Sequence, residues 1–273
     1  MTPQPAGPAW LFCPADRPER FAKAAAVADV VILDLEDGVA GPDKEAARAA
    51  LLATPLDPQR TVVRINAAGT ADHKSDLELL TRTAYTTVML PKSESAQQIV
   101  DLARWEVIVL IETPLGAVNV ADCARQDNAV AVMWGSEDLF AALGGTANRR
   151  PDGTLRDVAR HVRSAALLAA KAYQRLALDS VFLDIADVDG LRAEVDDGVA
   201  VGFDAKVAIH PTQIPVIRAG YAPTAPQLAW ARKVLAAARD QRGVFELDGM
   251  MVDMPVLRRA QRIIRTGGDE PPE

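Results

Sequence analysis

The stretch EVIVLIETPLG, residues 106–116, decides the fold class. It begins as a continuous apolar run of strand length, which is typical of parallel strands buried on both faces. Thr113 and Pro114 follow, an N-cap residue and then a proline at the first helical position. The stretch therefore predicts a buried strand that leads directly into a helix.

Similar runs recur along the chain, and a segment with a helical pattern follows each of them. This repetition, without a second sheet, predicts a TIM (β/α)8 barrel. An open doubly wound sheet would need fewer strands or a crevice where the strand order reverses. The eight predicted strands are residues 9–14, 30–36, 61–66, 87–92, 106–112, 131–138, 179–185 and 205–211.

Two parts of the chain depart from this regular spacing. The sixth connection is long and contains LGGTANRRPDG, residues 143–153, which is typical of a loop over the barrel mouth. A long helix is predicted to follow it, through Ala177. In the C-terminal region, Thr224 with Gln227 predicts a helix through about Arg242, and Pro255 opens a final helix. We therefore assign residues 1–220 to the barrel and residues 221–273 to a C-terminal helical extension.

The composition excludes several classes of function. The chain of 273 residues has 30 Lys and Arg against 37 Asp and Glu, and its net charge of -7 is unfavourable for nucleic acid or anionic lipid. No apolar stretch approaches the roughly 20 residues needed to cross a bilayer, and residues 1–10 do not resemble a signal peptide. Two cysteines, Cys13 and Cys123, form no disulfide framework, so we expect a cytoplasmic location.

Charged residues lie at or beside the ends of most predicted strands. In a barrel of this kind the active site lies where the strands meet the loops that follow them. Many charges inside an apolar barrel would be costly unless they formed a polar site at one mouth, with a cation for the acids and an anion for the bases. These residues are Asp34, Glu36, Asp37, Arg64, Lys92, Glu112, Glu137, Asp138, Asp184 and His210.

Glu112 and Asp138 end successive predicted strands, so their carboxylates can meet at one divalent ion. Because no Cys or His residues cluster, oxygen ligands favour Mg²⁺, or Mn²⁺, over zinc. The alternative is that either residue is an N-cap, since each precedes a helix. Position alone does not decide between these interpretations.

Three further side chains are candidates for substrate contacts. Arg64 lies in an apolar strand, where a barrel-facing guanidinium is expected to bind a carboxylate of the substrate. Its alternative is a buried ion pair with Glu36 or Asp37. Lys92 either binds an anion or neutralises the acidic loop. Met133 is predicted to lie in the barrel interior, and we include it among the substrate-binding residues.

Several motifs at these positions together resemble one family and cover most of the chain. They are similar to the citrate lyase beta-subunit-like (CitE-like) proteins of the HpcH/HpaI aldolase group, which includes malyl-CoA lyases and related 3-hydroxyacyl-CoA lyases. The motifs are DLEDGV (34–39), VRIN (63–66), MLPK (89–92), IETPLG (111–116), GSEDL (135–139), GFDAKVAIHPTQ (202–213) and GMMVDMP (249–255).

This resemblance implies a TIM barrel with a C-terminal extension, assembled as a homotrimer. It implies that Glu112 and Asp138 bind Mg²⁺, that Glu112 also contacts the substrate, and that Arg64 binds the carboxylate of a keto acid. It further implies that Asp253, delivered from a neighbouring subunit, is the catalytic acid or base. From the sequence alone, Asp253 is interpreted as the N-cap of the last helix. Asp37 would orient water or the acid/base group.

The implied reaction is the Mg²⁺-dependent cleavage, or formation, of the carbon–carbon bond of a 3-hydroxyacyl-CoA thioester by retro-Claisen chemistry. The products of cleavage are a keto acid and an acyl-CoA such as acetyl-CoA. The expected partners are therefore an acyl-CoA or acyl-carrier thioester and a small keto acid. Two alternatives stay open: an aldolase acting on free hydroxy-keto acids, and a partner-dependent citrate lyase beta subunit acting on a carrier-protein thioester.

Overall fold

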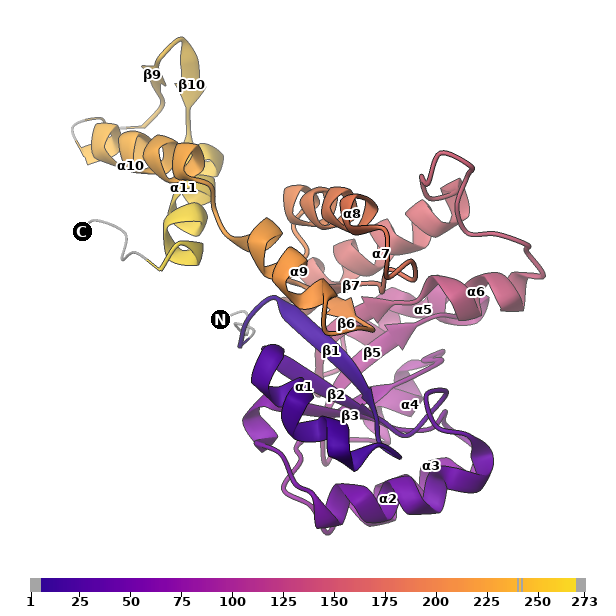
Figure 1. Cartoon of the computed structure of the whole chain (residues 1–273). Helices are drawn as coiled ribbons and strands as arrows, with labels where there is room; N and C mark the ends of the chain where they lie inside the picture. Colours follow the sequence, from indigo (N-terminus) through magenta and orange to yellow (C-terminus); the bar gives the residue numbers. More distant parts are fainter. Residues whose placement is uncertain (1–5, 240, 242, 269–273) are drawn as a thin grey trace. The chain divides into compact units, whose positions relative to one another are not determined.

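A computed structural model describes residues 6–239, 241 and 243–268. Eight parallel strands follow one another around a closed barrel, and pairing of the last strand with the first closes the ring (Figure 1). The strands are β1 (Ala9–Pro14), β2 (Val30–Asp34), β3 (Thr61–Arg64), β4 (Thr87–Leu90), β5 (Glu106–Ile111), β6 (Ala129–Trp134), β7 (Leu176–Asp179) and β8 (Ala205–Ala208). The predicted barrel is confirmed.

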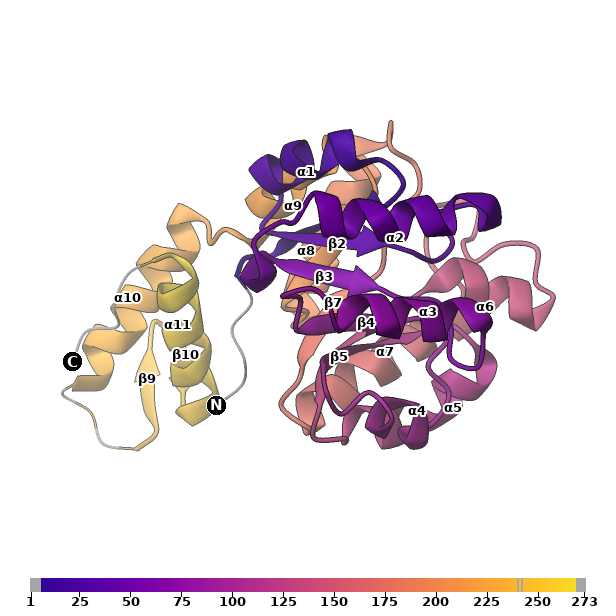
Figure 2. The ribbon, with the colours of Figure 1, turned by 90° about the horizontal axis from the view of Figure 1, so that it is seen from below.

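Helices connect the strands, and Figure 2 shows α1, α2 and α3 on the outside of β2 and β3. No helix within the described part of the chain is long and apolar enough to cross a membrane. The helices that accompany the barrel are α1 (Phe21–Val27), α2 (Lys44–Ala53), α3 (Ala71–Leu80), α4 (Ala96–Val100), α5 (Pro114–Ala124), α6 (Ser136–Leu143), α7 (Asp157–Ala172), α8 (Val188–Val201) and α9 (Gln213–Tyr221).

The barrel interior is an apolar core whose strands end in charge. Val62 and Leu110 belong to this core, and Met133 is buried in it, as predicted. Successive side chains of a strand point to opposite faces, so the residue two positions further on shares the same face. Those residues are Arg64 and Glu112. The inward-facing side chains of these strands are therefore apolar in the barrel interior and charged at its mouth.

The prediction of the seventh strand at residues 179–185 is wrong, because β7 lies at Leu176–Asp179. Helix α7 ends at Ala172, and Gln174 adopts a left-handed φ of 57° that ends the helical course of the chain. Leucine and alanine are strong helix formers, so the residues of β7 resembled a continuation of the helix. Asp184 therefore lies in the following loop, where its carboxylate accepts hydrogen bonds from backbone N–H groups.

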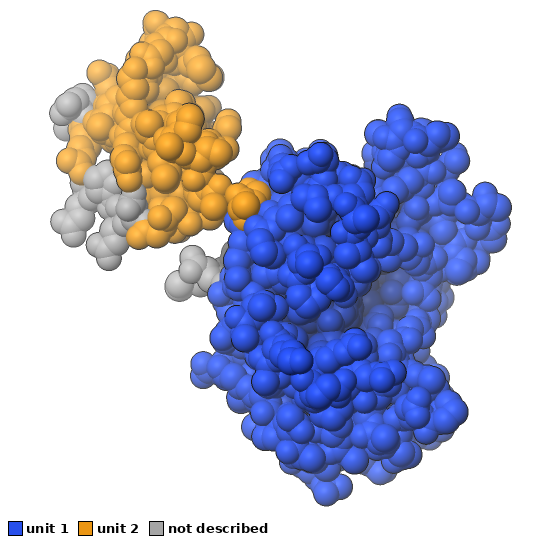
Figure 3. Space-filling view, viewed as in Figure 1, with its two compact units in different colours: residues 1–218 blue, residues 219–273 orange. Residues whose placement is uncertain are grey.

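The chain divides into two compact units, residues 1–218 and 219–273, so the division lies within α9 (Figure 3). The second unit contains α10 (Ala225–Arg239), an antiparallel hairpin of β9 (Phe245–Leu247) and β10 (Met250–Val252), and α11 (Met254–Thr266). A small apolar core joins these elements. Thr224 caps α10 as predicted, whereas the predicted helix end at Arg242 lies outside the described residues.

Candidate active site

Charged side chains at or after the ends of five consecutive strands, β2 to β6, form one cluster, the acidic cluster, at the barrel mouth. Five carboxylates and two cations are joined by ion pairs, so negative charge is in excess. The structure thus brings together seven of the ten charged residues that were predicted at the strand ends. The members are Asp34, Glu36, Asp37, Glu112 and Asp138 with Arg64 and Lys92.

Arg64 is held firmly at the side of this cluster. Its Nε and Nη2 atoms donate to the two carboxylate oxygens of Asp34 at 2.7 and 2.6 Å, and Nη1 lies 3.0 Å from Glu36 Oε2. The guanidinium also lies over the ring of Phe12, 4.7 Å from its centroid. The ion-pair interpretation is therefore confirmed for Glu36, but the main partner is Asp34. Because Asp34 takes two of the five N–H donors of the guanidinium, others remain for a further anion.

Glu112 is a buried carboxylate without full compensation of its charge. It is 3% exposed, and Lys92 donates its backbone N–H to Oε1 at 3.0 Å. Burial, together with the nearby charge of Asp138, raises the pKa of Glu112 to about 8. Gly135 leaves room for the carboxylate, since a Cβ atom there would lie 2.9 Å from Oε2. A bound cation would stabilise the ionised form of this group.

The alternative that Glu112 or Asp138 is an N-cap is wrong. Thr113 caps α5, where its hydroxyl accepts a hydrogen bond from Gly116 N–H at 3.0 Å. Gly135 occupies the N-cap position of α6, and Asp138 lies within the first turn of that helix. Both carboxylates are therefore free of a capping role.

The ammonium of Lys92 lies between the carboxylates. Its Nζ atom is 3.4 Å from Asp138 Oδ1 and 3.9 Å from Glu112 Oε1, and it also pairs with Glu36 and with Asp37, the latter at 3.2 Å. In this structure Lys92 therefore neutralises the acidic loop. Burial alone would lower the pKa of Lys92, but these carboxylates raise it above its ordinary value.

The donor set fits a hard divalent cation. Glu112 directly follows β5, whereas Asp138 lies in α6 and not at the end of a strand as predicted, because β6 ends at Trp134. Both carboxylates approach the same cationic group, so one ion can reach both. Two protein carboxylates, with water and substrate in the remaining positions, are a common arrangement for Mg²⁺. In residues 6–239, 241 and 243–268, no three His, Cys, Asp or Glu side chains group as ligands.

Asp253 belongs to the second unit. It is the N-cap of α11, and its carboxylate accepts a hydrogen bond from Val256 N–H at 3.2 Å. The interpretation of Asp253 as the N-cap of the last helix is confirmed. The fold of this unit therefore uses one oxygen of the carboxylate to begin the helix.

The sequence interpretation missed a second group of charges, the balanced cluster, which is attached to β7 and β8. Asp179 and Lys206 are fully buried, and alternation turns both away from the interior, because their strand neighbours Leu178 and Val207 belong to the core. Three carboxylates match three cations here. They are Asp179, Glu194 and Asp197 with Arg149, Arg163 and Lys206.

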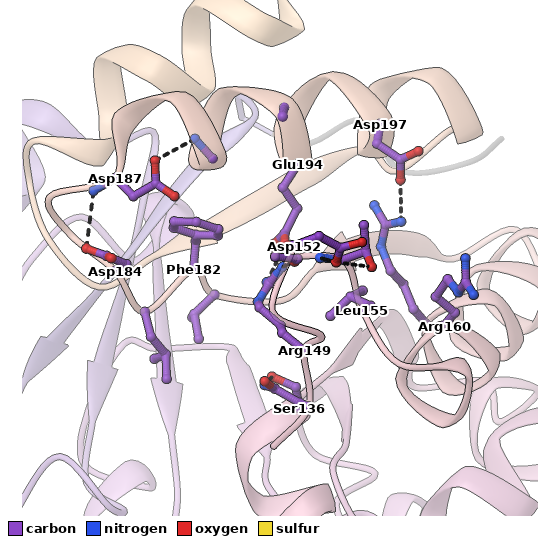
Figure 4. A pocket seen from close by; sticks show the side chains of 18 of the residues that line it. Ser136, Arg149, Asp152, Leu155, Arg160, Phe182, Asp184, Asp187, Glu194 and Asp197 are labelled. Atoms are coloured by element: carbon purple, nitrogen blue, oxygen red, sulfur yellow. Dashed lines mark hydrogen bonds and ion pairs between the residues drawn. The ribbon is translucent and has the colours of Figure 1, made fainter. Parts of the chain in front are cut away.

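The balanced cluster lies beside a cavity of about 650 Å³. In its lining, Arg149 and Glu194 point toward one another and form an ion pair, with Phe182 close by (Figure 4). The guanidinium of Arg149 also lies over the Phe182 ring, 5.1 Å from its centroid. Burial would raise the pKa of Asp179, but Lys206 and Arg163 hold it below the ordinary aspartate value. The charges in this region compensate one another.

Known proteins resemble this chain over nearly its whole length. The HpcH/HpaI aldolase/citrate lyase family matches residues 9–211. A citrate lyase subunit beta-like protein of Mycobacterium tuberculosis is 64% identical over 269 residues, 98% of either chain. A mitochondrial citramalyl-CoA lyase of Rattus norvegicus is 30% identical over 292 residues, which cover 93% of this chain and 84% of that one. The crystal structure of CitE from Mycobacterium tuberculosis with magnesium, acetoacetate and coenzyme A has a TM-score of 0.94 at 64% identity and covers 96% of this chain and 98% of that chain.

Proposed function

The chain belongs to the HpcH/HpaI aldolase/citrate lyase family of carbon–carbon lyases, and we propose that it cleaves or forms the carbon–carbon bond of a 3-hydroxyacyl-CoA thioester with the help of Mg²⁺. The cleavage products would be a keto acid and an acyl-CoA such as acetyl-CoA. The related CitE structure contains magnesium, acetoacetate and coenzyme A, which supports these classes of reactant.

One observation in this chain carries the proposal. Glu112, directly after β5, and Asp138, in the first turn of α6, approach the same cation, and Glu112 is buried with a raised pKa. Two carboxyl groups held together in this way favour full ionisation only when a cation binds between them. Mg²⁺ bound there would supply Lewis acid chemistry by polarising the oxygen atoms of a hydroxy or keto acid.

The side chains of the cluster have distinct roles in this proposal. Arg64, oriented by Asp34, binds the carboxylate of the keto-acid part with its remaining N–H donors. Met133 contributes an apolar wall from the barrel core, and Asp37 orients the acid/base group or a water molecule. The 3-hydroxyl group passes its proton to water, and its oxygen becomes the carbonyl oxygen of the keto acid. As the carbon–carbon bond breaks, its electron pair passes to the α carbon of the thioester fragment, where the carboxyl of Asp253 donates a proton.

We place Asp253 in the site of a neighbouring subunit, within a homotrimer. The C-terminal unit exposes three methionines beside it, Met250, Met251 and Met254, with exposed fractions of 61, 66 and 58%. Large exposed apolar side chains gathered in one segment are typical of an interface between proteins. This supports assembly through the hairpin and the start of α11.

Replacement of the two carboxylates tests the proposed function. Glu112→Gln and Asp138→Asn should lower divalent-dependent cleavage of malyl-CoA or citramalyl-CoA at least ~10³-fold, since a Lewis acid contributes several kcal/mol. Glu106→Gln is the matched control, because Glu106 is exposed at the opposite end of the same strand. Full activity in either cluster variant would refute the metal assignment. Turnover of free hydroxy-keto acids but not of acyl-CoA would favour the aldolase alternative. Turnover only with an added carrier protein would favour the partner-dependent citrate lyase beta subunit.

A mixed assembly tests the shared site. Asp253→Ser removes the carboxylate but keeps an N-cap side chain for α11, so the helix is retained. Mixing these subunits with Arg64→Ala subunits should restore part of the activity that each variant lacks. If mass measurement shows that mixed assemblies form and their activity does not recover, this would count against a site shared between subunits.

A further inference from the structure

Lys92 is the one member of the acidic cluster that contacts both the candidate metal ligands and their neighbours. Its ammonium lies within ion-pair distance of Glu112 and Asp138 on one side and of Glu36 and Asp37 on the other. The contacts to Glu36 and Asp37 are the shorter ones. Both pairs of carboxylates therefore share a single cation.

The backbone of Lys92 is held while its side chain keeps some freedom. Its φ of 49° is left-handed, an uncommon conformation for a residue with a Cβ atom. The N–H of the same residue donates to Glu112 Oε1 at 3.0 Å, which ties the backbone to a candidate ligand. The side chain is 31% exposed, so the ammonium has room to move within the cluster.

A divalent ion and this ammonium would compete for the same oxygens. Nζ lies 3.4 and 3.9 Å from carboxylate oxygens that, under the proposed function, bind Mg²⁺. Two cations at such short range repel one another, most strongly where water is partly excluded. Glu36, which is 5% exposed, and Asp37 already bind Nζ, so a small shift of the ammonium toward them gives it a second position away from Glu112 and Asp138.

We propose that Lys92 is a resident counter-cation, which contacts all four carboxylates in the metal-free protein and transfers wholly to Glu36 and Asp37 when the divalent ion binds. The inference rests on the proposed function and adds the residue that regulates metal entry. Lys92 is thus a positioning residue: it sets the charge and position of the two ligands, and Glu36 acts on the metal through Lys92.

Calorimetric titration with MgCl₂, and with MnCl₂, measures this effect without an activity assay. Lys92→Met should tighten metal binding by ~5-fold or more, because the competitor is removed, whereas Lys92→Arg should stay near wild type. A merely structural role predicts the opposite sign, since loss of a supporting residue usually weakens metal affinity 10- to 100-fold. Unchanged or weaker binding by folded Lys92→Met would overturn the inference.

Two variants test the second position of the ammonium. Glu36→Gln should weaken metal binding by ~10-fold, because the ammonium would then stay with the ligands. Asp37→Asn should also weaken metal binding, but by less than Glu36→Gln. This variant keeps the contact between Arg64 and Glu36, so its effect does not come from loss of that ion pair. In a Lys92→Met background the Glu36→Gln effect should vanish, since coupled residues are not additive. Equal effects in both backgrounds would contradict the transfer.

The outcomes separate this inference from the function itself. If wild-type protein binds no divalent ion, or binds it no better than Glu112→Gln, the metal assignment fails. If wild type binds metal through Glu112 and only the Lys92 series departs from expectation, the counter-cation role fails alone. If Lys92→Met does not fold, the titrations of Glu36→Gln and Asp37→Asn test the inference instead. Metal binding by these two variants as tight as in wild type would overturn the transfer of the ammonium.

Discussion

The two charged clusters of this barrel differ in balance. The acidic cluster sets five carboxylates against two cations, whereas the balanced cluster sets three against three. The consequence appears in one buried carboxylate of each: the pKa of Glu112 is raised to about 8, and that of Asp179 is lowered. Both carboxylates are buried, so the lack of compensating positive charge is what distinguishes the candidate active site from a structural network.

The largest expected effect is on the stability that the balanced cluster contributes. Lys206→Met should cost about 3–5 kcal/mol of unfolding free energy, because it leaves buried Asp179 and Glu194 without their lysine partner. Lys233→Met, in an exposed pair with Asp248, should cost about 1 kcal/mol or less. Denaturant unfolding of both variants measures this. A loss for Lys206→Met no larger than for the control would show that balance is not what stabilises the region.

A smaller effect concerns pH. Because the native pKa of Glu112 is raised to about 8, above its ordinary value near 4.3, its contribution to stability is present below about pH 4 and is lost as pH rises toward 8. Metal-free wild type should therefore lose about 2 kcal/mol relative to Glu112→Gln between pH 5 and 7. Denaturant unfolding across this range provides the measurement, with Glu106→Gln as the control that should parallel wild type.

Asp179 should behave with the opposite sign. Its pKa is lowered, so its contribution is present above the ordinary aspartate value and is lost only as pH falls below about 4. For Glu112, the plots of unfolding free energy against pH should differ between wild type and Glu112→Gln. Parallel plots between pH 5 and 7 would show that the two clusters do not differ in this respect.

The smallest effect is steric. In Gly135→Ala, the new Cβ atom would lie 2.9 Å from Glu112 Oε2, so the carboxylate must shift and metal affinity should fall by ~5-fold, equivalent to about 1 kcal/mol. Gly41→Ala is the control, since no atom lies within 4 Å of a Cβ atom built there. Calorimetric titration with MgCl₂ measures both. Wild-type affinity in Gly135→Ala would mean that the position of Glu112 does not limit metal binding.

Much of the candidate site was predictable, because the chain places charged residues directly after apolar strands. Arg64, Glu112 and Asp138 were identified in this way, and the structure brings them into one cluster. The pairing of Arg64 with Asp34 was missed, although strand alternation places both on the same face of neighbouring strands. The strand at Leu176–Asp179 was missed because its leucines and alanine also suit a helix.

The sequence by itself determined the barrel and the residues at its strand ends, because hydrophobic periodicity and helix start signals act over a few neighbouring residues. Only the tertiary structure decided which charges are compensated. Closure of the barrel brings side chains of β2, β3 and β5 to one mouth, and packing of α7 and α8 against β7 and β8 buries another set with matching partners. Electrostatic energy depends on distance and burial, and neither can be known before distant segments of the chain meet.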